Sequence, residues 1–135
     1  MKEKLIKLLE NSYSPYSKFR VSAIVVTKDK KEFVGVNVEN AAYGSSICAE
    51  RSAILQAISQ GYKKGELESL YVMCDNKKIG MPCFACRQVV SELFSEDAII
   101  TCMNPDGDEL KLQVKDLCPY PFGSEDLKWK AVLLV

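Results

Sequence analysis

The stretch CAERSAILQAISQGYKKG, residues 48–65, contains the clearest helix in the sequence. Small and aliphatic side chains recur in it at the spacing that places them on one face of a helix. The members of this face are Ala49, Ala53, Ile54, Ala57 and Ile58. Ser45 or Ser46 could cap the start of the helix, and Gly61 suits its end because glycine tolerates the left-handed backbone that often follows a helix. We therefore predict the rest of the fold outward from this helix.

Strand-like and helix-like patterns alternate on either side of it. Short runs rich in β-branched and aromatic residues predict five strands, namely a hairpin over 19–40 with a charged turn at 28–31, and single strands at 66–76, 98–104 and 109–114. Apolar residues at helical spacing predict further helices at 2–12, at 81–94 and in the tail, where Ser124 is the expected cap. This order predicts an α/β fold of three α/β/α layers, in which a mixed five-stranded sheet has helices on both faces.

Length and charge limit what this fold can do. We expect residues 1–135 to form a single domain. The 18 basic residues balance the 18 acidic ones, which argues against a broad nucleic-acid surface and mildly favours a defined oligomer. The N-terminus has no signal-peptide pattern, and no apolar run is long enough to cross a bilayer. We therefore expect a cytoplasmic protein that binds neither nucleic acid nor membranes.

The chain contains six cysteines and no histidine, so cysteines are the main candidates for metal ligands or catalytic groups. In an intracellular chain of this length, cysteines indicate metal binding or catalysis more often than disulfides. Cys74 and Cys102 fall in strand-like runs and are predicted to be small buried core residues. Cys118 precedes a proline in a loop and is assigned no role. The remaining three are Cys48, Cys83 and Cys86.

These three cysteines stand at the starts of two predicted helices. Cys48 begins the helix at 48–65, and Cys83 and Cys86 lie on the first turn of the helix at 81–94. If both helices start at the same edge of the sheet, the three thiolates converge there, and the positive helix ends favour their ionised form. Three thiolates select zinc, and a fourth position left open is typical of a catalytic zinc site.

Charged neighbours of these cysteines extend the prediction. Glu50 lies two residues after Cys48, so its carboxylate can reach the open zinc position and exchange protons with a bound water. The alternative is a surface glutamate that the helix dipole favours. Three thiolates on one Zn²⁺ carry a net negative charge, so a cation is needed nearby. Arg51 and Arg87 each stand next to a motif residue and are the two candidates.

The pattern of Cys48-Ala49-Glu50 followed by Pro82-Cys83-Phe84-Ala85-Cys86 matches the signature of zinc deaminases. The wider sequence resembles the small homotetrameric cytidine deaminases of nucleoside salvage. The resembling segments are SPYSKFRV, GVNVENAAYG, ICAER, PCFACRQVV and PYPFGSEDL, which with their spacing span nearly the whole chain. The resemblance implies hydrolytic deamination of cytidine and deoxycytidine in pyrimidine salvage, with one zinc ion per subunit.

The resemblance also assigns roles to individual residues. Cys48, Cys83 and Cys86 would bind zinc, Glu50 would carry protons, and Arg51 would offset the thiolate charge. Tyr43 and Phe122 would complete the site of a neighbouring subunit in a homotetramer. The full set of residues implied to contact the nucleoside is Phe19, Asn37, Glu39, Tyr43, Ala49 and Phe122.

The segment GVNVENA supports part of this assignment from the residues alone. On a strand, Asn37 and Glu39 point to one side, where an amide and a carboxylate can hydrogen-bond a sugar diol. The alternatives are an exposed polar strand face for this pair, and plain core or interface packing for Phe19, Tyr43 and Phe122. Two positions depart from the family pattern, because Phe84 and Ser22 stand where glycine is usual.

Four other functions fit parts of the sequence. A sister deaminase could act on another aminopyrimidine such as blasticidin S, although Asn37 and Glu39 favour a ribose. An editor of polynucleotides needs a basic, aromatic-lined groove, which zero net charge does not favour. A non-catalytic zinc module would not need an open position or Glu50. A thiol oxidoreductase would use Cys83 and Cys86 as a redox pair.

Overall fold

The computed structural model describes residues 1–128 and contains a mixed five-stranded sheet in the order β2-β1-β3-β4-β5. The strand β1 pairs antiparallel with β2 and with β3, β3 pairs parallel with β4, and β4 pairs antiparallel with β5. The strands span Val21–Thr27 (β1), Glu32–Val36 (β2), Leu67–Cys74 (β3), Phe94–Met103 (β4) and Glu109–Gln113 (β5). The five predicted strands are therefore present, and β1 and β2 form the predicted hairpin.

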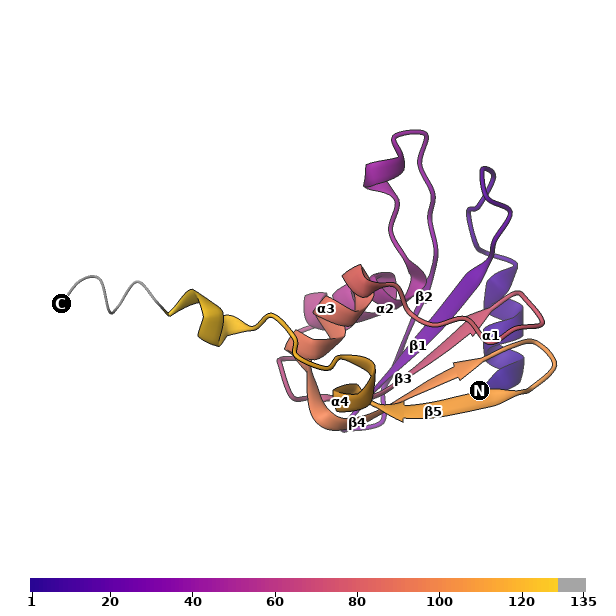
Figure 1. Ribbon diagram of the computed structural model, residues 1–135. Helices are drawn as coiled ribbons and strands as arrows, with labels where there is room; N and C mark the ends of the chain where they lie inside the picture. The colour runs from indigo at the N-terminus through magenta and orange to yellow at the C-terminus, as the bar shows by residue number, and fades with distance from the viewer. Residues whose placement is uncertain (129–135) are drawn as a thin grey trace.

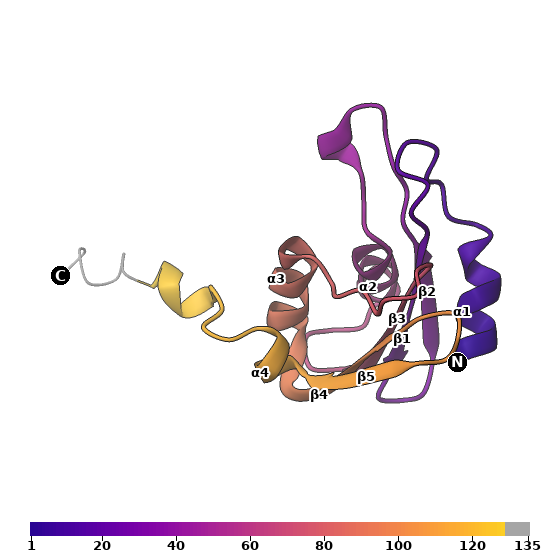
Figure 2. The same ribbon diagram turned by 45° about the vertical axis from the view of Figure 1, so that its right-hand side comes forward.

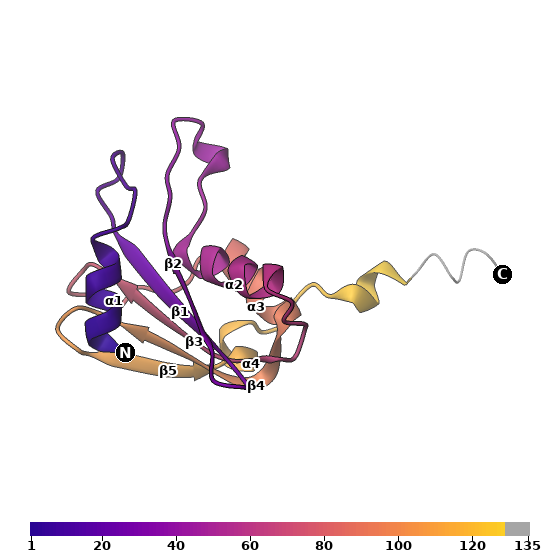
Figure 3. The ribbon, with the colours of Figure 1, turned by 180° about the vertical axis from the view of Figure 1, so that it is seen from behind.

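Helices cover both faces of this sheet (Figure 2). Helix α1 lies on one face, while α2 and α3 lie on the other, with the sheet between them (Figures 1 and 3). The helices span Lys2–Leu9 (α1), Ala49–Ser59 (α2), Phe84–Leu93 (α3) and Val114–Leu117 (α4), and two short 3-10 helices span Tyr43–Ser45 (η1) and Ser124–Leu127 (η2). The prediction of a three-layer α/β/α fold is confirmed.

Two hydrophobic cores follow from the alternation of side chains along the central strands. In β1, Ala23 and Val25 are fully buried against α2, whereas Ile24 points to the other face and packs on Leu5 and Leu9 of α1. Strands buried on both faces read as continuous apolar runs, as β1 does. The apolar face predicted for α2 is the face that packs on the sheet.

Gly35 in β2 allows α2 to approach the sheet closely. A Cβ at this position would stand 2.5 Å from the backbone nitrogen of Ala53 and 2.6 Å from the carbonyl oxygen of Ala49. Neither contact is possible for a real side chain, so the position requires glycine as long as α2 lies where it does. At the other end of the helix, Gly61 has φ +99° and takes up the left-handed turn that was predicted for it.

The ends of several elements differ from the sequence prediction. Cys48, and neither Ser45 nor Ser46, occupies the N-cap of α2, because the chain reaches the helix in an extended conformation at Cys48. The short helix α4 was not predicted. Ser124 is the first residue of η2 and does not cap it, since the carboxylate of Asp126 accepts from the backbone N–H of Gly123. The remainder of the predicted tail helix lies outside the described residues.

Three segments extend beyond the layers of the fold. The connection from β2 to α2, which includes η1, and the connection from α1 to β1 rise beside each other at one end of the sheet (Figures 1 and 3). The chain after α4 leads away from the sheet and helices (Figure 1). No helix within residues 1–128 is long and apolar enough to cross a membrane.

Candidate metal centre

The first residues of α2 and α3 bring three thiols together. Cys48 and Cys83 are the N-cap residues of the two helices, and Cys86 lies on the first turn of α3. Their three sulfur atoms all lie within 4.8 Å of one another, and the Sγ atoms of Cys48 and Cys83 are 3.7 Å apart. The predicted convergence of the two helix starts is therefore observed.

This geometry fits a zinc ion. With Zn–S bonds of about 2.3 Å, tetrahedral coordination separates two ligand sulfurs by roughly 3.8 Å, which matches the distance between Cys48 and Cys83. Cys86 is buried, whereas Cys83 is exposed, so the cluster is covered on one side and accessible from the other. Three soft ligands with access on one side are what a zinc site with an open position requires.

The charges around the thiols also favour a bound cation. Hydrogen bonding to Cys86, with a further hydrogen bond from Arg51, lowers the pKa of Cys48 to about 5. The same contact with Cys48, together with burial, raises the pKa of Cys86. One sulfur is thus stabilised as thiolate at the expense of its neighbour. A divalent metal removes this conflict, because it stabilises all the coordinating thiolates at once.

The structure distinguishes the two arginines that stood as candidates for charge compensation. The guanidinium of Arg51 donates through Nη2 to Cys48 Sγ at 3.4 Å, and this contact raises the arginine pKa further. Its Nε is buried and has no hydrogen-bond partner among the described residues. Arg87 donates instead to the carbonyl oxygens of Pro82 and Leu117. Arg51 is therefore the cation that touches the thiol cluster.

Glu50 lies next to this cluster on the first turn of α2 and is only 4% exposed. Burial is the main cause that raises its carboxyl pKa to about 7, and the charge of Cys48 acts in the same direction. A carboxyl group with a pKa near neutrality can both accept and release a proton under ordinary conditions. The alternative of a solvated surface glutamate does not describe this side chain.

The other three cysteines do not join the cluster. Cys74 and Cys102 are buried in the core on β3 and β4, as predicted, and burial raises their pKa to about 12 and about 11. Cys118 is partly buried, and its thiol donates to the carbonyl oxygen of Arg87 at 3.4 Å. All six cysteines are free thiols. The position of each cysteine in the fold thus distinguishes the three candidate metal ligands from the other three cysteines.

Asn37 and Glu39 lie beyond the end of β2, and both side chains are engaged with the connection between α1 and β1. The amide oxygen of Asn37 accepts from Ser12 Oγ at 2.5 Å and from the backbone N–H of Val21 at 2.9 Å, and its nitrogen donates to the carbonyl oxygen of Phe19. The carboxylate of Glu39 accepts from the backbone N–H of Tyr16 and Ser17 and from the Ser17 hydroxyl, and the hydroxyl contact is the main cause that lowers its pKa. These side chains shape the loop that carries Phe19.

Of the remaining predicted contacts, three aromatic side chains are exposed, whereas Ala49 is fully buried at the start of α2. Phe19 is 41% exposed, Tyr43 is 76% exposed and Phe122 is 57% exposed. Tyr43 packs edge-on against Tyr16 with ring centroids 6.0 Å apart, and with Glu39 these residues line a cavity of about 370 Å³. Phe122 lies in the segment after α4, where its carbonyl oxygen accepts from Gln88 of α3. Phe122 lines a different cavity from the one that Tyr43 lines.

Sequence reasoning missed several residues that support these groups. Ser12, which was predicted to end the first helix but lies beyond α1, and Ser17, in the connection that follows, hold Asn37 and Glu39. The hydroxyl of the buried Ser22 donates to the carbonyl oxygen of Leu5 at 2.8 Å, which gives this departure from glycine a function in fastening α1 to the sheet. Serines in a turn-rich segment carry no signal that identifies their partners, because the partners are distant in sequence.

A three-layer fold that brings three thiols and a buried carboxylate to two helix starts defines the class of zinc-binding deaminase domains. The model of the cytidine and deoxycytidylate deaminase zinc-binding region matches residues 1–102. The cytidine deaminase of Halalkalibacterium halodurans is 39% identical over 122 residues, which cover 90% of this chain and 91% of that protein. The cytidine deaminase of Sporosarcina psychrophila is 38% identical over 133 residues, which cover 96% of each chain.

A solved structure agrees with these relatives. The crystal structure of cytidine deaminase from Burkholderia pseudomallei superposes with a TM-score of 0.85 at 41% sequence identity, over 89% of this chain and 94% of that one. The chain belongs to the cytidine and deoxycytidylate deaminase family.

Proposed function

We propose that this chain catalyses the hydrolytic deamination of cytidine and deoxycytidine to uridine and deoxyuridine. The observation that carries the proposal is the site itself, in which Cys48, Cys83 and Cys86 have their sulfurs within 4.8 Å of one another and Glu50 lies buried beside them. Relatives named cytidine deaminase match at 38% and 39% identity over nearly their whole length. A thiol oxidoreductase needs only the pair Cys83 and Cys86, so it does not account for the third converging thiol, Cys48.

Glu50 moves the protons of this reaction. Bound zinc supplies a Lewis acid that lowers the pKa of water at the open position. Glu50 takes a proton from the attacking water and delivers it to N3 of the base, while the water oxygen forms a bond to C4. In the tetrahedral product of this addition, Glu50 transfers the remaining hydroxyl proton to the amino nitrogen. The C4–N bond then breaks, ammonia leaves, and the C4 carbonyl of uridine forms.

The neighbours of Glu50 hold and tune the site. Cys48, Cys83 and Cys86 are the proposed zinc ligands. Arg51, which donates to Cys48 Sγ, offsets the negative charge of three thiolates on one divalent ion. The backbone N–H of Ala49 is one of the first in α2 and has no partner within the helix, so it is available to the carbonyl oxygen of the base.

The sugar and the base ring are proposed to bind the loops above the thiols. A carboxylate has about four lone-pair sites, and Glu39 uses three of them in contacts with Tyr16 and Ser17. Asn37 keeps a second N–H after its bond to Phe19. The pair can therefore accept from and donate to a ribose diol while it holds the loop, and Phe19 packs against the pyrimidine.

The proposed assembly is a homotetramer of single-domain subunits over residues 1–135, working in pyrimidine salvage in the cytoplasm. Tyr43 and Phe122 support it, because both are highly exposed aromatic side chains on segments that extend beyond the layers of the fold. In the tetramer they complete the site of a neighbouring subunit. A reducing compartment agrees with six free thiols, three of which are proposed metal ligands.

An absorbance assay on zinc-loaded protein tests the activity. The substrates are cytidine, deoxycytidine, cytosine and blasticidin S, each at the same concentration. We expect turnover of both nucleosides and little of the free base, which lacks the sugar that Asn37 and Glu39 would hold. Turnover of blasticidin S alone would assign the chain to a sister activity, and no turnover of either nucleoside would overturn the proposal.

A further inference from the structure

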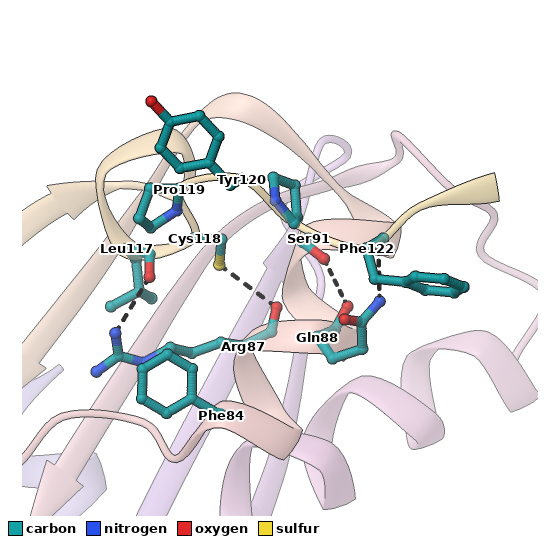
Figure 4. A pocket seen from close by; sticks show the side chains of 10 residues that line it. Phe84, Arg87, Gln88, Ser91, Leu117, Cys118, Pro119, Tyr120 and Phe122 are labelled. Carbon is teal, nitrogen blue, oxygen red and sulfur yellow. Dashed lines mark hydrogen bonds between the residues drawn. The ribbon is translucent and has the colours of Figure 1, made fainter. Parts of the chain in front are cut away.

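Arg87 connects the loop of the candidate metal centre to the last residue of α4. It lies beneath a cavity of about 310 Å³ between α3 and residues 117–122 (Figure 4). Its Nε donates to the carbonyl oxygen of Pro82 at 2.8 Å, and its Nη1 donates to the carbonyl oxygen of Leu117 at 3.2 Å. The carbonyl oxygen of Arg87 in turn accepts from the Cys118 thiol. One side chain thus fixes two segments that are distant in sequence.

Phe84 covers the guanidinium of Arg87. The guanidinium carbon stands 4.4 Å from the centroid of the Phe84 ring, which is cation–π geometry. The Phe84 side chain is otherwise 76% exposed, so it neither joins a core nor touches the thiols. A glycine at this position would leave this face of the guanidinium open to water. The phenyl ring therefore restricts Arg87.

The carbonyl of Pro82 matters because it belongs to the peptide group that leads into Cys83. Residues 75–83 form neither helix nor strand, and Cys83 itself is exposed. The position of this thiol therefore depends on side chains that fix the loop backbone. A hydrogen bond from Arg87 to the Pro82 carbonyl fixes the plane of that peptide group, and with it the direction in which Cys83 leaves the loop.

We propose that Arg87 is a positioning residue for the zinc ligands and that Phe84, stacked on it, keeps it in place. The inference rests on the proposed metal site and is independent of which substrate the enzyme takes. It differs from charge compensation, which Arg51 supplies through direct contact with Cys48. Groups that orient metal ligands without touching the metal typically change metal affinity by about 10- to 100-fold when they are removed.

The test measures the rate at which zinc leaves the full-length holoprotein for an excess of a chromogenic chelator. R87K keeps the charge but loses the planar group that reaches both carbonyls, and we expect release on the order of tenfold faster. F84L keeps bulk without an aromatic face, and we expect release about two- to fivefold faster. F84Y keeps the ring and should release zinc at the wild-type rate.

Gln88→Ala is the matched control for the segment after α4. Gln88 follows Arg87 in α3 and holds this segment through the Phe122 carbonyl oxygen, but it does not contact Pro82. Q88A should therefore release zinc at the wild-type rate. The d–d absorption bands of Co²⁺-substituted protein give a second readout, which should broaden or shift in R87K and F84L only, because they report the arrangement of the ligand sulfurs.

Each outcome has one meaning. Wild-type release rates in R87K show that Arg87 contributes charge and no positioning, which overturns the inference. Equal acceleration in Q88A and R87K points to general loosening of the segment after α4 and overturns it as well. F84L that behaves as wild type removes the part assigned to Phe84. A wild-type protein without stoichiometric zinc would overturn the metal site itself, and the inference with it.

Discussion

The thiol cluster and the loops above it are built in opposite ways. At the thiol cluster, Ala49 and Cys86 are fully buried and Glu50 is 4% exposed, because two helix starts hold them against the sheet. In the loops, Phe19 and Tyr43 are 41% and 76% exposed and pack on no core. The groups proposed for chemistry are thus fixed before any substrate arrives, whereas those proposed for recognition leave apolar surface uncovered.

This contrast indicates how the work of the site is divided. A preorganised cluster of titratable groups can shift pKa values strongly, and Glu50 and Cys48 both show this. Exposed aromatic side chains contribute favourable burial free energy only when a ligand or another chain covers them. We therefore expect changes at the cluster to lower turnover or metal content, and changes in the loops to alter substrate affinity.

The largest effect is expected for Cys83→Ala. Removal of one of three thiols leaves two proposed ligands, so metal content measured by atomic absorption should fall from near stoichiometric to near background, with no measurable turnover. Cys74→Ala is the control, because Cys74 is a buried cysteine that lies outside the cluster. C74A should keep its zinc and most of its activity. A full zinc complement in C83A would contradict the assigned ligand set.

Glu50→Gln should have the next largest effect. The amide keeps the size and the neighbours of the carboxylate but cannot carry a proton, so kcat should fall on the order of 10²- to 10⁴-fold with zinc retained. Glu92→Gln is the control, since Glu92 is an exposed glutamate in α3 whose ion pair, within residues 1–128, is with Lys64 at the surface. Steady-state kinetics with cytidine measure both variants. Near-normal kcat in E50Q would remove Glu50 from the mechanism.

The sequence predicted the cluster better than the loops for a physical reason. Cys48 and Cys83 take the N-cap positions of amphipathic helices, and the periodicity of those helices is readable from the residues around them. A helix–strand–helix order then brings both starts to one edge of the sheet. The sequence did not predict that Arg51 donates to a thiol whereas Arg87 donates to two backbone carbonyls. Each arginine directly follows a motif residue, so the two positions look equivalent in the sequence.

The contacts of the loop residues could not be predicted from the sequence either. Asn37 and Glu39 were expected to point from a strand, yet β2 ends at Val36 and their side chains bond to the connection between α1 and β1. Alternation of residue types gives a direction only while a strand continues. Once the strand ends, the partners of a polar side chain depend on the path of another loop, and a single sequence does not encode that path in any local pattern.

Gly35→Ala should have an intermediate effect on stability and turnover, because Gly35 packs against a helix that carries part of the thiol cluster. The added Cβ would meet the backbone of α2 at Ala53 and Ala49, so the helix start that carries Cys48 must shift. Overpacking of this kind should lower the free energy of unfolding by about 1–3 kcal/mol, measured by urea denaturation, and it should also lower kcat. Gly44→Ala is the control, because a Cβ at Gly44 meets nothing within 4 Å. Equal stability of the two variants would show that α2 is not held as closely as described.

Phe122→Ala tests the recognition region. If the ring completes the site of a neighbouring subunit, KM for cytidine should rise about 2- to 12-fold, as expected for loss of an aromatic contact, while zinc content and unfolding stay at the wild-type level. Tyr120→Ala is the control from the same segment, since its side chain is fully exposed. A wild-type KM in F122A would confine the substrate site to groups within one subunit, and light scattering on both variants shows whether the assembly is kept.

The smallest effect is expected for Ser17→Ala, which acts on one hydrogen bond to Glu39. That bond is the main cause that holds the pKa of Glu39 below its ordinary value of 4.5, so in S17A the carboxyl resonance of Glu39, followed by NMR, should titrate at higher pH than in the wild type. Because the Glu39 pKa is lower in the folded protein than in the unfolded chain, its carboxylate adds to the free energy of unfolding. This contribution is fully present at a pH above the unfolded-state pKa and is lost as the pH falls through the folded-state pKa. The stability difference between S17A and the wild type should therefore appear above about pH 4.5 and shrink in more acidic solution.

Ser14→Ala, which changes a serine of the same loop that does not contact Glu39, should leave the Glu39 titration unchanged. An unshifted Glu39 titration in S17A would mean that the loop is held by the backbone contacts of Tyr16 and Ser17, and the exposed recognition region would then be more rigid than its side-chain exposure implies.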